Sequence, residues 1–211
     1  SAVYAQEISS TVEKARVDGI VARARTIFIM DDGKESVSST VSTYFFARDR
    51  YRLDIHDDGK LREIQWYVPE GDELVQTSYR IEDASTTVDR HPKSEGATDP
   101  IAHLVTIVGY IDRADRRFDP KEIDGHECVG FEISADKVYA PDTPTTHRIS
   151  FDTETRLPVL LEYDRPSNIE HIQRMVTAFD RFGWNPRLPA DTFTPHPSLR
   201  EDGRRRSRPT F

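Results

Sequence analysis

The sequence predicts an α+β protein in which helices cover one face of a large, curved antiparallel sheet. Most of the chain alternates apolar and polar residues with the period of two that is typical of half-buried strands. Short turns containing Asp and Gly separate these segments, and Asp-Gly favours tight hairpins. One stretch in mid-chain instead shows the period of an amphipathic helix.

The first half of the chain predicts a short helix followed by an antiparallel meander. Residues 7–16 are expected to form the helix. Asp32-Gly33 and Asp58-Gly59 mark hairpin turns, because Gly accepts the positive φ that these turns need. The strands are expected at residues 19–30, 36–46, 51–55, 61–68, 74–80 and 85–90.

The mid-chain helix is expected to begin at Asp99 and Pro100. Asp is a favourable N-cap, and Pro is tolerated at the first helical position, where its missing N–H has no intrahelical partner. The helix is expected to reach Asp115, with Arg116 and Arg117 near its C-terminal end, where the helix dipole favours cations. Its apolar stripe contains Ile101, Leu104, Val105, Val108 and Ile111.

The second half of the chain predicts four more strands. They are expected at residues 128–134, 146–151, 157–163 and 169–180. The last of these segments fits a strand or a helix, and the two preceding hairpins favour a strand. Residues 183–197 contain four prolines and are expected along a surface or an edge.

Composition excludes several classes of protein. The net charge of −8 disfavours a nucleic-acid-binding protein, because counterion displacement from the phosphate backbone needs a positive field. No window of 18 residues is apolar throughout, so no transmembrane helix is expected. The single cysteine, Cys128, cannot form an internal disulfide bond.

The two ends of the chain indicate export and a basic tail. Residues 3–7 (VYAQE) have the small-residue pattern of a signal-peptidase site, so we expect a periplasmic or otherwise exported location. Residues 1–197 are expected to form one domain. Residues 198–211 contain five arginines and are expected to form a flexible basic tail, or to contact an acidic partner or an anionic membrane surface.

Three segments of the C-terminal half resemble a family of periplasmic proteins. Residues 124–133 (DGHECVGFEI) resemble a strand of the LolA-like outer-membrane lipoprotein carriers, which are similar to the sigma-factor regulators of the MucB/RseB type. Residues 151–162 (FDTETRLPVLLE) resemble the hairpin that follows. Residues 179–197 resemble the family's C-terminal strand and its ending.

This resemblance implies an unclosed β-barrel with helices at its mouth. It also implies an exported location and a hydrophobic cavity for acyl chains. The matching residues make turns, an edge and a core strand, and no catalytic residue carries over. The resemblance therefore implies a binding protein rather than an enzyme.

The sequence carries no pattern that predicts catalysis, a metal site or a cofactor. It contains no G-x-S-x-G, no P-loop and no G-x-G-x-x-G. His126 and Cys128 could supply two zinc ligands from one strand, but zinc needs four and spacing marks no others. The alternative is an exposed histidine beside a buried cysteine. Adjacent acids such as Asp57 and Asp58 are expected in turns.

Apolar residues of the first meander and of the helix are the candidate ligand-binding residues. Alternation is expected to place the strand residues on the concave face of the sheet. Two interpretations stay open: an ordinary core packed by the helix, or a cavity that the helix only partly fills. The candidates are Phe28, Met30, Phe45, Tyr51, Leu53, Ile64, Trp66, Leu104, Val105 and Val108.

We therefore expect a non-enzymatic, exported binding protein that holds a lipid, an acyl chain or an acylated protein in a half-barrel cavity. The alternative is an envelope sensor or protein-interaction module that regulates a sigma/anti-sigma system without lipid transfer. In that case an exposed sheet edge or the basic tail would contact a membrane-anchored regulator.

Overall fold

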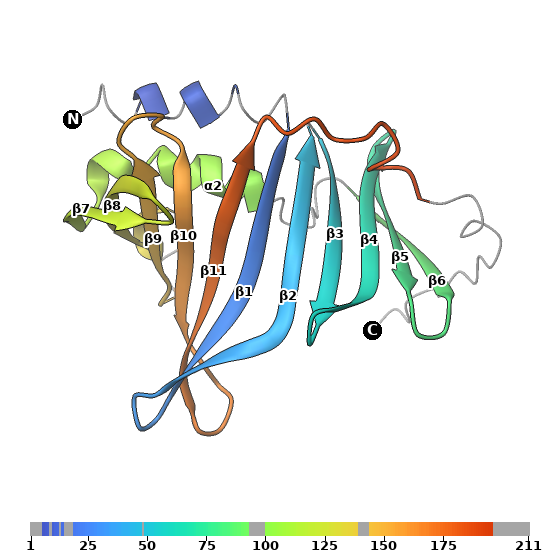
Figure 1. The fold of residues 1–211 in the computed structure, drawn as a ribbon, viewed down its shortest axis with the longest axis horizontal. Helices are drawn as coiled ribbons and strands as arrows, with labels where there is room; N and C mark the ends of the chain where they lie inside the picture. Colours follow the sequence, from blue (N-terminus) through green and yellow to red (C-terminus); the bar gives the residue numbers. More distant parts are fainter. Residues whose placement is uncertain are drawn as a thin grey trace.

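The protein is described from a computed structural model as one antiparallel sheet of 11 strands. The strand order is β6-β5-β4-β3-β2-β1-β11-β10-β9-β8-β7, so β6 and β7 lie at opposite edges and the sheet does not close into a barrel. Figure 1 shows its strong curvature. The predicted fold class is confirmed. The structure describes residues 6–8, 10–12, 14, 19–47, 49–92, 100–138 and 144–195.

The first meander contains the six strands that the sequence predicts. At the turn between β3 and β4, Asp58 and Gly59 adopt φ values of 48° and 73°, as the Asp-Gly pattern predicts. The strands are β1 (Ile20–Met30), β2 (Glu35–Ala47), β3 (Arg50–Asp57), β4 (Lys60–Glu70), β5 (Glu73–Arg80) and β6 (Ser85–Pro92).

The second meander contains one strand more than expected. Arg116 and Arg117 do not follow a helix end but begin the edge strand β7, where their guanidinium groups lie over the rings of Phe118 and Phe131. Most of the segment 169–180 forms a strand, as predicted, but residues 169–171 form a turn and the strand runs from Ile172 to Trp184. The strands are β7 (Arg116–Ile123), β8 (His126–Ser134), β9 (Thr146–Asp152), β10 (Pro158–Pro166) and β11 (Ile172–Trp184).

The mid-chain helix α2 (Pro100–Val108) is shorter than predicted. The amide of Gly109 donates to the carbonyls of both Val105 and Thr106 at 3.1 Å, and the chain then turns into a short 3-10 helix, η2 (Ile111–Arg113). A second 3-10 helix, η3 (Ala135–Lys137), follows β8. The predicted N-cap Asp99 and the basic tail lie outside the described residues.

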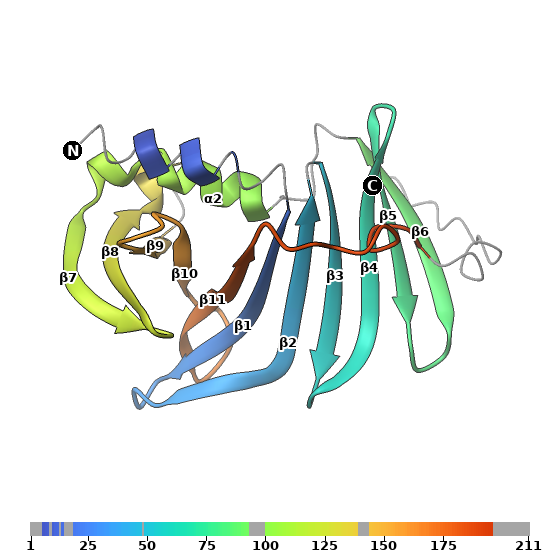
Figure 2. The same cartoon turned by 45° about the horizontal axis from the view of Figure 1, so that its top comes forward.

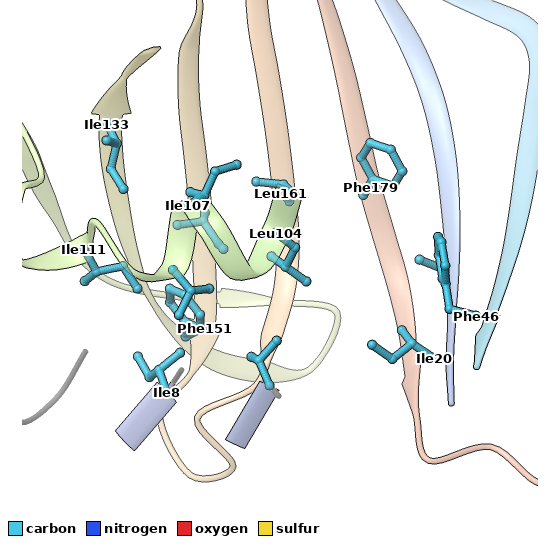
Figure 3. Close-up of a cluster of buried hydrophobic side chains, with 14 of the residues drawn as sticks. Ile8, Ile20, Phe46, Leu104, Ile107, Ile111, Ile133, Phe151, Leu161 and Phe179 are labelled. Atoms are coloured by element: carbon cyan, nitrogen blue, oxygen red, sulfur yellow. The ribbon is translucent and has the colours of Figure 1, made fainter. Parts of the chain in front are cut away.

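One apolar core joins the helices to the inner, concave face of the sheet. Residues 6–8 and 10–12 are helical and lie beside α2 in both views (Figures 1 and 2). Ile8, Leu104, Phe151 and Phe179 belong to one cluster, which Figure 3 shows between the helices and the strands. The two meanders meet where β1 pairs with β11, so this core spans both of them.

Candidate functional site

The inner face of the first meander is lined by aromatic and small residues. Cross-strand neighbours in register point to the same face. The register therefore continues the buried positions Ile20 and Phe46 into Tyr51 and Tyr67. The Tyr51 and Tyr67 rings stack with their centroids 4.2 Å apart. Burial first, then Tyr44 and nearby carboxylates, raises the pKa of Tyr67 to about 12. This row is a firmly packed part of the face.

The adjacent rows of the inner face keep apolar surface exposed. Ala22 pairs in register with Tyr44, Tyr44 with Leu53, and Leu53 with Gln65. Tyr44 and Leu53 are half-buried. Phe28 and Met30 continue the alternation of β1 on this face and are half-buried too. These residues form what we call the inner strip, defined as Phe28, Met30, Tyr44, Leu53 and Ile55.

Ile64 and Trp66 do not lie on this face, contrary to the prediction. The hairpin pairs Asp57 with Lys60, which would place Leu53 opposite Ile64. A β-bulge between Ile55 and His56 shifts the register by one residue, so Leu53 instead pairs with Gln65. A shift of one residue moves every later side chain of β4 to the other face.

The C-terminal segment covers the displaced Trp66 on the outer face. Trp66 is only 4% exposed, and its indole N–H donates to the carbonyl of Thr192 at 3.2 Å. The Arg52 guanidinium lies 5.8 Å from the Trp66 ring and 5.5 Å from the Phe45 ring. Phe45, the third misplaced candidate, pairs with Arg52 and so also lies on the outer face.

Helix α2 closes the inner face at the other end of the sheet. Leu104 and Val108 are 1% and 0% exposed and belong to the core with Phe131 and Leu161. They have the environment of ordinary core residues. Val105 is half-buried and is the predicted helix candidate that retains surface.

A cluster of three rings lies where α2 meets β9 and β10. His103 of α2 lies 6.0 Å from His147 of β9 and 5.2 Å from Tyr163 of β10, measured between ring centroids. His147 is 1% exposed. Burial, reinforced by His103, lowers the pKa of His147 to about 4, and burial also lowers the pKa of His103. The alternation of His147 with Ile149 and Phe151 was the sequence signal for this inward position.

Charged residues of β1, β9, β10 and β11 lie on the outer face of the sheet and pair with one another. The Asp180 carboxylate accepts hydrogen bonds from Arg23 at 2.7 and 2.8 Å and from Arg25 at 3.0 Å. Asp164 pairs with Arg174 and lies 3.4 Å from Arg148. The sheet therefore has one charged face and one largely apolar face.

The residues that carry the resemblance in segments 124–133 and 151–162 make structural contacts. Asp152 accepts the amides of Glu154 at 2.7 Å and Thr155 at 3.0 Å, and Nδ1 of His126 lies 2.5 Å from it. Gly130 leaves room for Phe118 of β7, since a Cβ there would lie 3.1 Å from its ring. These contacts fit the structural roles that the resemblance implies for residues 124–133 and 151–162.

The described residues contain no group of three or more histidine, cysteine or acidic side chains that could hold a metal ion. Cys128 is buried, and burial raises the pKa of its thiol, which disfavours the reactive thiolate. His126 is half exposed beside it. Among the helices that the structure describes, none has the length and apolar character to cross a membrane.

Comparison with known proteins finds similarity in structure and none in sequence. No protein-family model matches the chain, and no curated protein matches it. LppX, a lipoprotein of Mycobacterium tuberculosis, has a TM-score of 0.49 and 11% identity over 90% of this chain and 100% of its own.

Two further structures come from the groups that the sequence resembles. A LolA superfamily protein of Nitrosomonas europaea has a TM-score of 0.32 and 13% identity, over 90% of this chain and 97% of its own. MucB, solved in complex with MucA, has a TM-score of 0.37 and 12% identity, over 92% of this chain and 60% of its own.

Proposed function

We propose that this protein is an exported, non-enzymatic binding protein that holds a lipid or acyl chain against the inner strip. The observation that carries the proposal is the separation of the two faces. On β1, Ala24, Thr26 and Phe28 line the inner face, whereas Arg23 and Arg25 point outward to Asp180. An acyl chain gains free energy from apolar contact, at roughly 25 cal/mol per Å².

The geometry of the strip fits an elongated apolar ligand. Ala22 and Ala24 of β1 are buried beneath the neighbouring side chains, and the half-buried Tyr44 and Leu53 of β2 and β3 supply the apolar surface that stays accessible. Val105 of α2 lies on the same side of the sheet and packs against the core. An acyl chain seated here would lie along the strands and end beneath the helix.

Binding of a dansyl-labelled fatty acid to the whole protein tests the proposal. Leu53→Gln, which places an amide in the inner strip, is expected to weaken binding about tenfold, equivalent to ~1.4 kcal/mol. Ile64→Gln is the matched control, because Ile64 is also half-buried but lies on the outer face. Native mass spectrometry should show co-purified lipid. Absence of probe binding and of lipid would reject the proposal.

The edge strand β6 supports a second candidate, a protein-interaction module. β6 pairs with β5 without interruption from Ser85 to Pro92, and Val88 is 38% exposed. At the other edge, the register of β7 breaks between Phe118 and Lys121. An uninterrupted edge strand is a template for an extended segment of a partner.

Thr87→Pro tests this second candidate, because proline removes one backbone N–H from β6. If a membrane-anchored regulator binds at this edge, the variant should lose it in a pull-down while the bound lipid, if any, is unaffected. Asp83→Ala in the preceding turn serves as the control, since Asp83 bonds only to neighbouring residues of the turn in the contacts described. Equal recovery of the regulator by both variants would exclude β6.

A further inference from the structure

The inner face of the sheet changes from apolar to polar between β3 and β4. Leu53, in the inner strip, pairs in register with Gln65 of β4. Gln65 pairs with Ser78 of β5, and Ser78 pairs with Thr87 of β6. Residues paired in this way point to the same face. Gln65, Ser78 and Thr87, which we call the polar row, therefore continue the inner strip with one amide and two hydroxyl groups.

Side-chain hydrogen bonds place the polar row on the inner face independently of the register. The hydroxyl of Tyr67, a member of the inner core cluster, donates to Oε1 of Gln65 at 2.8 Å. Nε2 of Gln65 donates in turn to Oε1 of Glu63 at 2.7 Å. On β5, Nε2 of Gln76 donates to Oγ of Ser78 at 3.3 Å, and Gln76 pairs with Tyr67. These side chains thus line the same concave surface as Tyr67.

The apolar side chains of β4 and β5 lie mainly on the opposite, outer face. Trp66 and Val75 are buried but lie outside the inner core cluster, and Trp66 bonds to Thr192 of the C-terminal segment. Thr77, in register with Trp66, is buried on that side too. An amphiphile on the inner face therefore meets apolar side chains on β2 and β3 and hydrogen-bonding groups from β4 to β6.

The charges beside the polar row favour an uncharged group on it. Glu63 and Arg80 pair in register on one side, and Asp89, in register with Gln76, lies on the other. Arg80 also lies 3.8 Å from Asp83, so acidic groups already compensate its charge. An anion would face the two flanking carboxylates, and a cation would face Arg80. Amides and hydroxyls both donate and accept hydrogen bonds, and so do the hydroxyl groups of a ligand.

We propose that the ligand of the inner strip is an amphiphile with an uncharged, hydroxyl-rich headgroup, and that the polar row binds this headgroup. This inference rests on the proposed function for the acyl chain. Neighbouring strands lie ~4.8 Å apart, so the row spans roughly 10 Å from β4 to β6. The acyl chain would run from Leu53 toward α2, which covers the opposite end of the sheet from β6 (Figures 1 and 2).

Displacement of the dansyl-labelled fatty acid from the whole protein compares headgroups on one chain length. The competitors are monolauroylglycerol, dodecyl glucoside, dodecyl phosphate and dodecylamine, each below its critical micelle concentration. At least one of the two hydroxylated competitors should displace the probe at about tenfold lower concentration than the two charged ones. The tighter of the two then identifies the headgroup as a glycerol or a sugar.

Ser78→Ala and Thr87→Val each remove one hydroxyl group of the polar row with little change in shape. Each should weaken binding of the preferred hydroxylated competitor about fivefold and leave binding of the dansyl-labelled fatty acid unchanged. Either variant suffices if the other does not fold. Thr86→Val is the matched control, because Thr86 is the neighbouring residue of β6 and pairs with Tyr79 on the outer face.

The outcomes separate this inference from the proposed function. Equal displacement by all four competitors, or a preference for a charged one, overturns the headgroup proposal and leaves the proposed function in place. The same holds if both row variants bind the hydroxylated competitor normally, or if Thr86→Val weakens it equally. A protein that binds neither the probe nor any competitor rejects the proposed function and the headgroup proposal together.

Discussion

Replacing Trp66 by alanine would test the register of the β3–β4 hairpin. The Trp66 side chain is 4% exposed on the outer face. Its truncation removes roughly 150 Å² of buried apolar surface, or about 4 kcal/mol of stability. In a chain of 211 residues each kcal/mol lowers the melting temperature by roughly 2–4 °C, so a fall of roughly 8–16 °C is expected.

Thermal and urea unfolding measure this loss, and limited proteolysis measures its location. Because the Trp66 indole bonds to Thr192, residues 185–195 should become sensitive to protease in Trp66→Ala. Trp66→Phe keeps one six-membered aromatic ring at this position but loses the indole N–H and its hydrogen bond. We therefore expect the free energy of unfolding to fall by only about 1–2 kcal/mol. Reduced fatty-acid binding with an unchanged C-terminal segment would instead place Trp66 on the inner face and refute the register.

Two further substitutions test the outer face. Asp180→Ala leaves Arg23 and Arg25 without their shared carboxylate. Because these two arginine side chains are 28% and 33% exposed, we expect the free energy of unfolding to fall by about 2 kcal/mol. An unchanged midpoint of urea unfolding would contradict this expectation. Burial raises the pKa of Asp180, but the two arginines outweigh it and the net shift is downward, so this contribution is present above about pH 4 and lost as the pH falls further. Gly130→Ala places a Cβ 3.1 Å from the Phe118 ring, and should cost about 1 kcal/mol and speed hydrogen exchange in β7; unchanged exchange there would show that Phe118 can shift freely.

The positions of most strands were predictable because turn chemistry and alternation agree. The Asp58-Gly59 turn has the positive φ values that its sequence indicates, and the strands on either side begin and end beside it. Segment 169–180 was ambiguous by period alone, yet its place after two hairpins favoured the strand that the structure has.

The faces of β4 were not predictable, because both of its alternations contain large apolar or aromatic residues. Ile64 and Trp66 make one set, and Gln65 and Tyr67 belong to the other. A single bulge residue decides between them, and the cover that the C-terminal segment provides lets an outward Trp66 be buried. Turn sequence alone does not reveal a bulge inside the strand.

The strand β7 and the end of α2 escaped prediction for related reasons. β7 is an edge strand with charged residues and Pro120 and therefore lacks an apolar period. The apolar stripe continues from Val108 to Ile111, but Gly109 ends the α-helix and η2 carries Ile111 back to the core. Spacing alone did not distinguish a continuous helix from this two-part arrangement.

The pairing of β1 with β11 has a consequence for the order of assembly. Each meander is built from neighbours in sequence, but the seam between them joins Ile20 to Trp184, almost the full length of the described chain apart. During synthesis, this seam can form only after the last strand has emerged. Because the formation of such long-range contacts is slow, the apolar inner face of each meander stays exposed to solvent until β1 and β11 pair. A chaperone would therefore protect the chain most during this stage of folding.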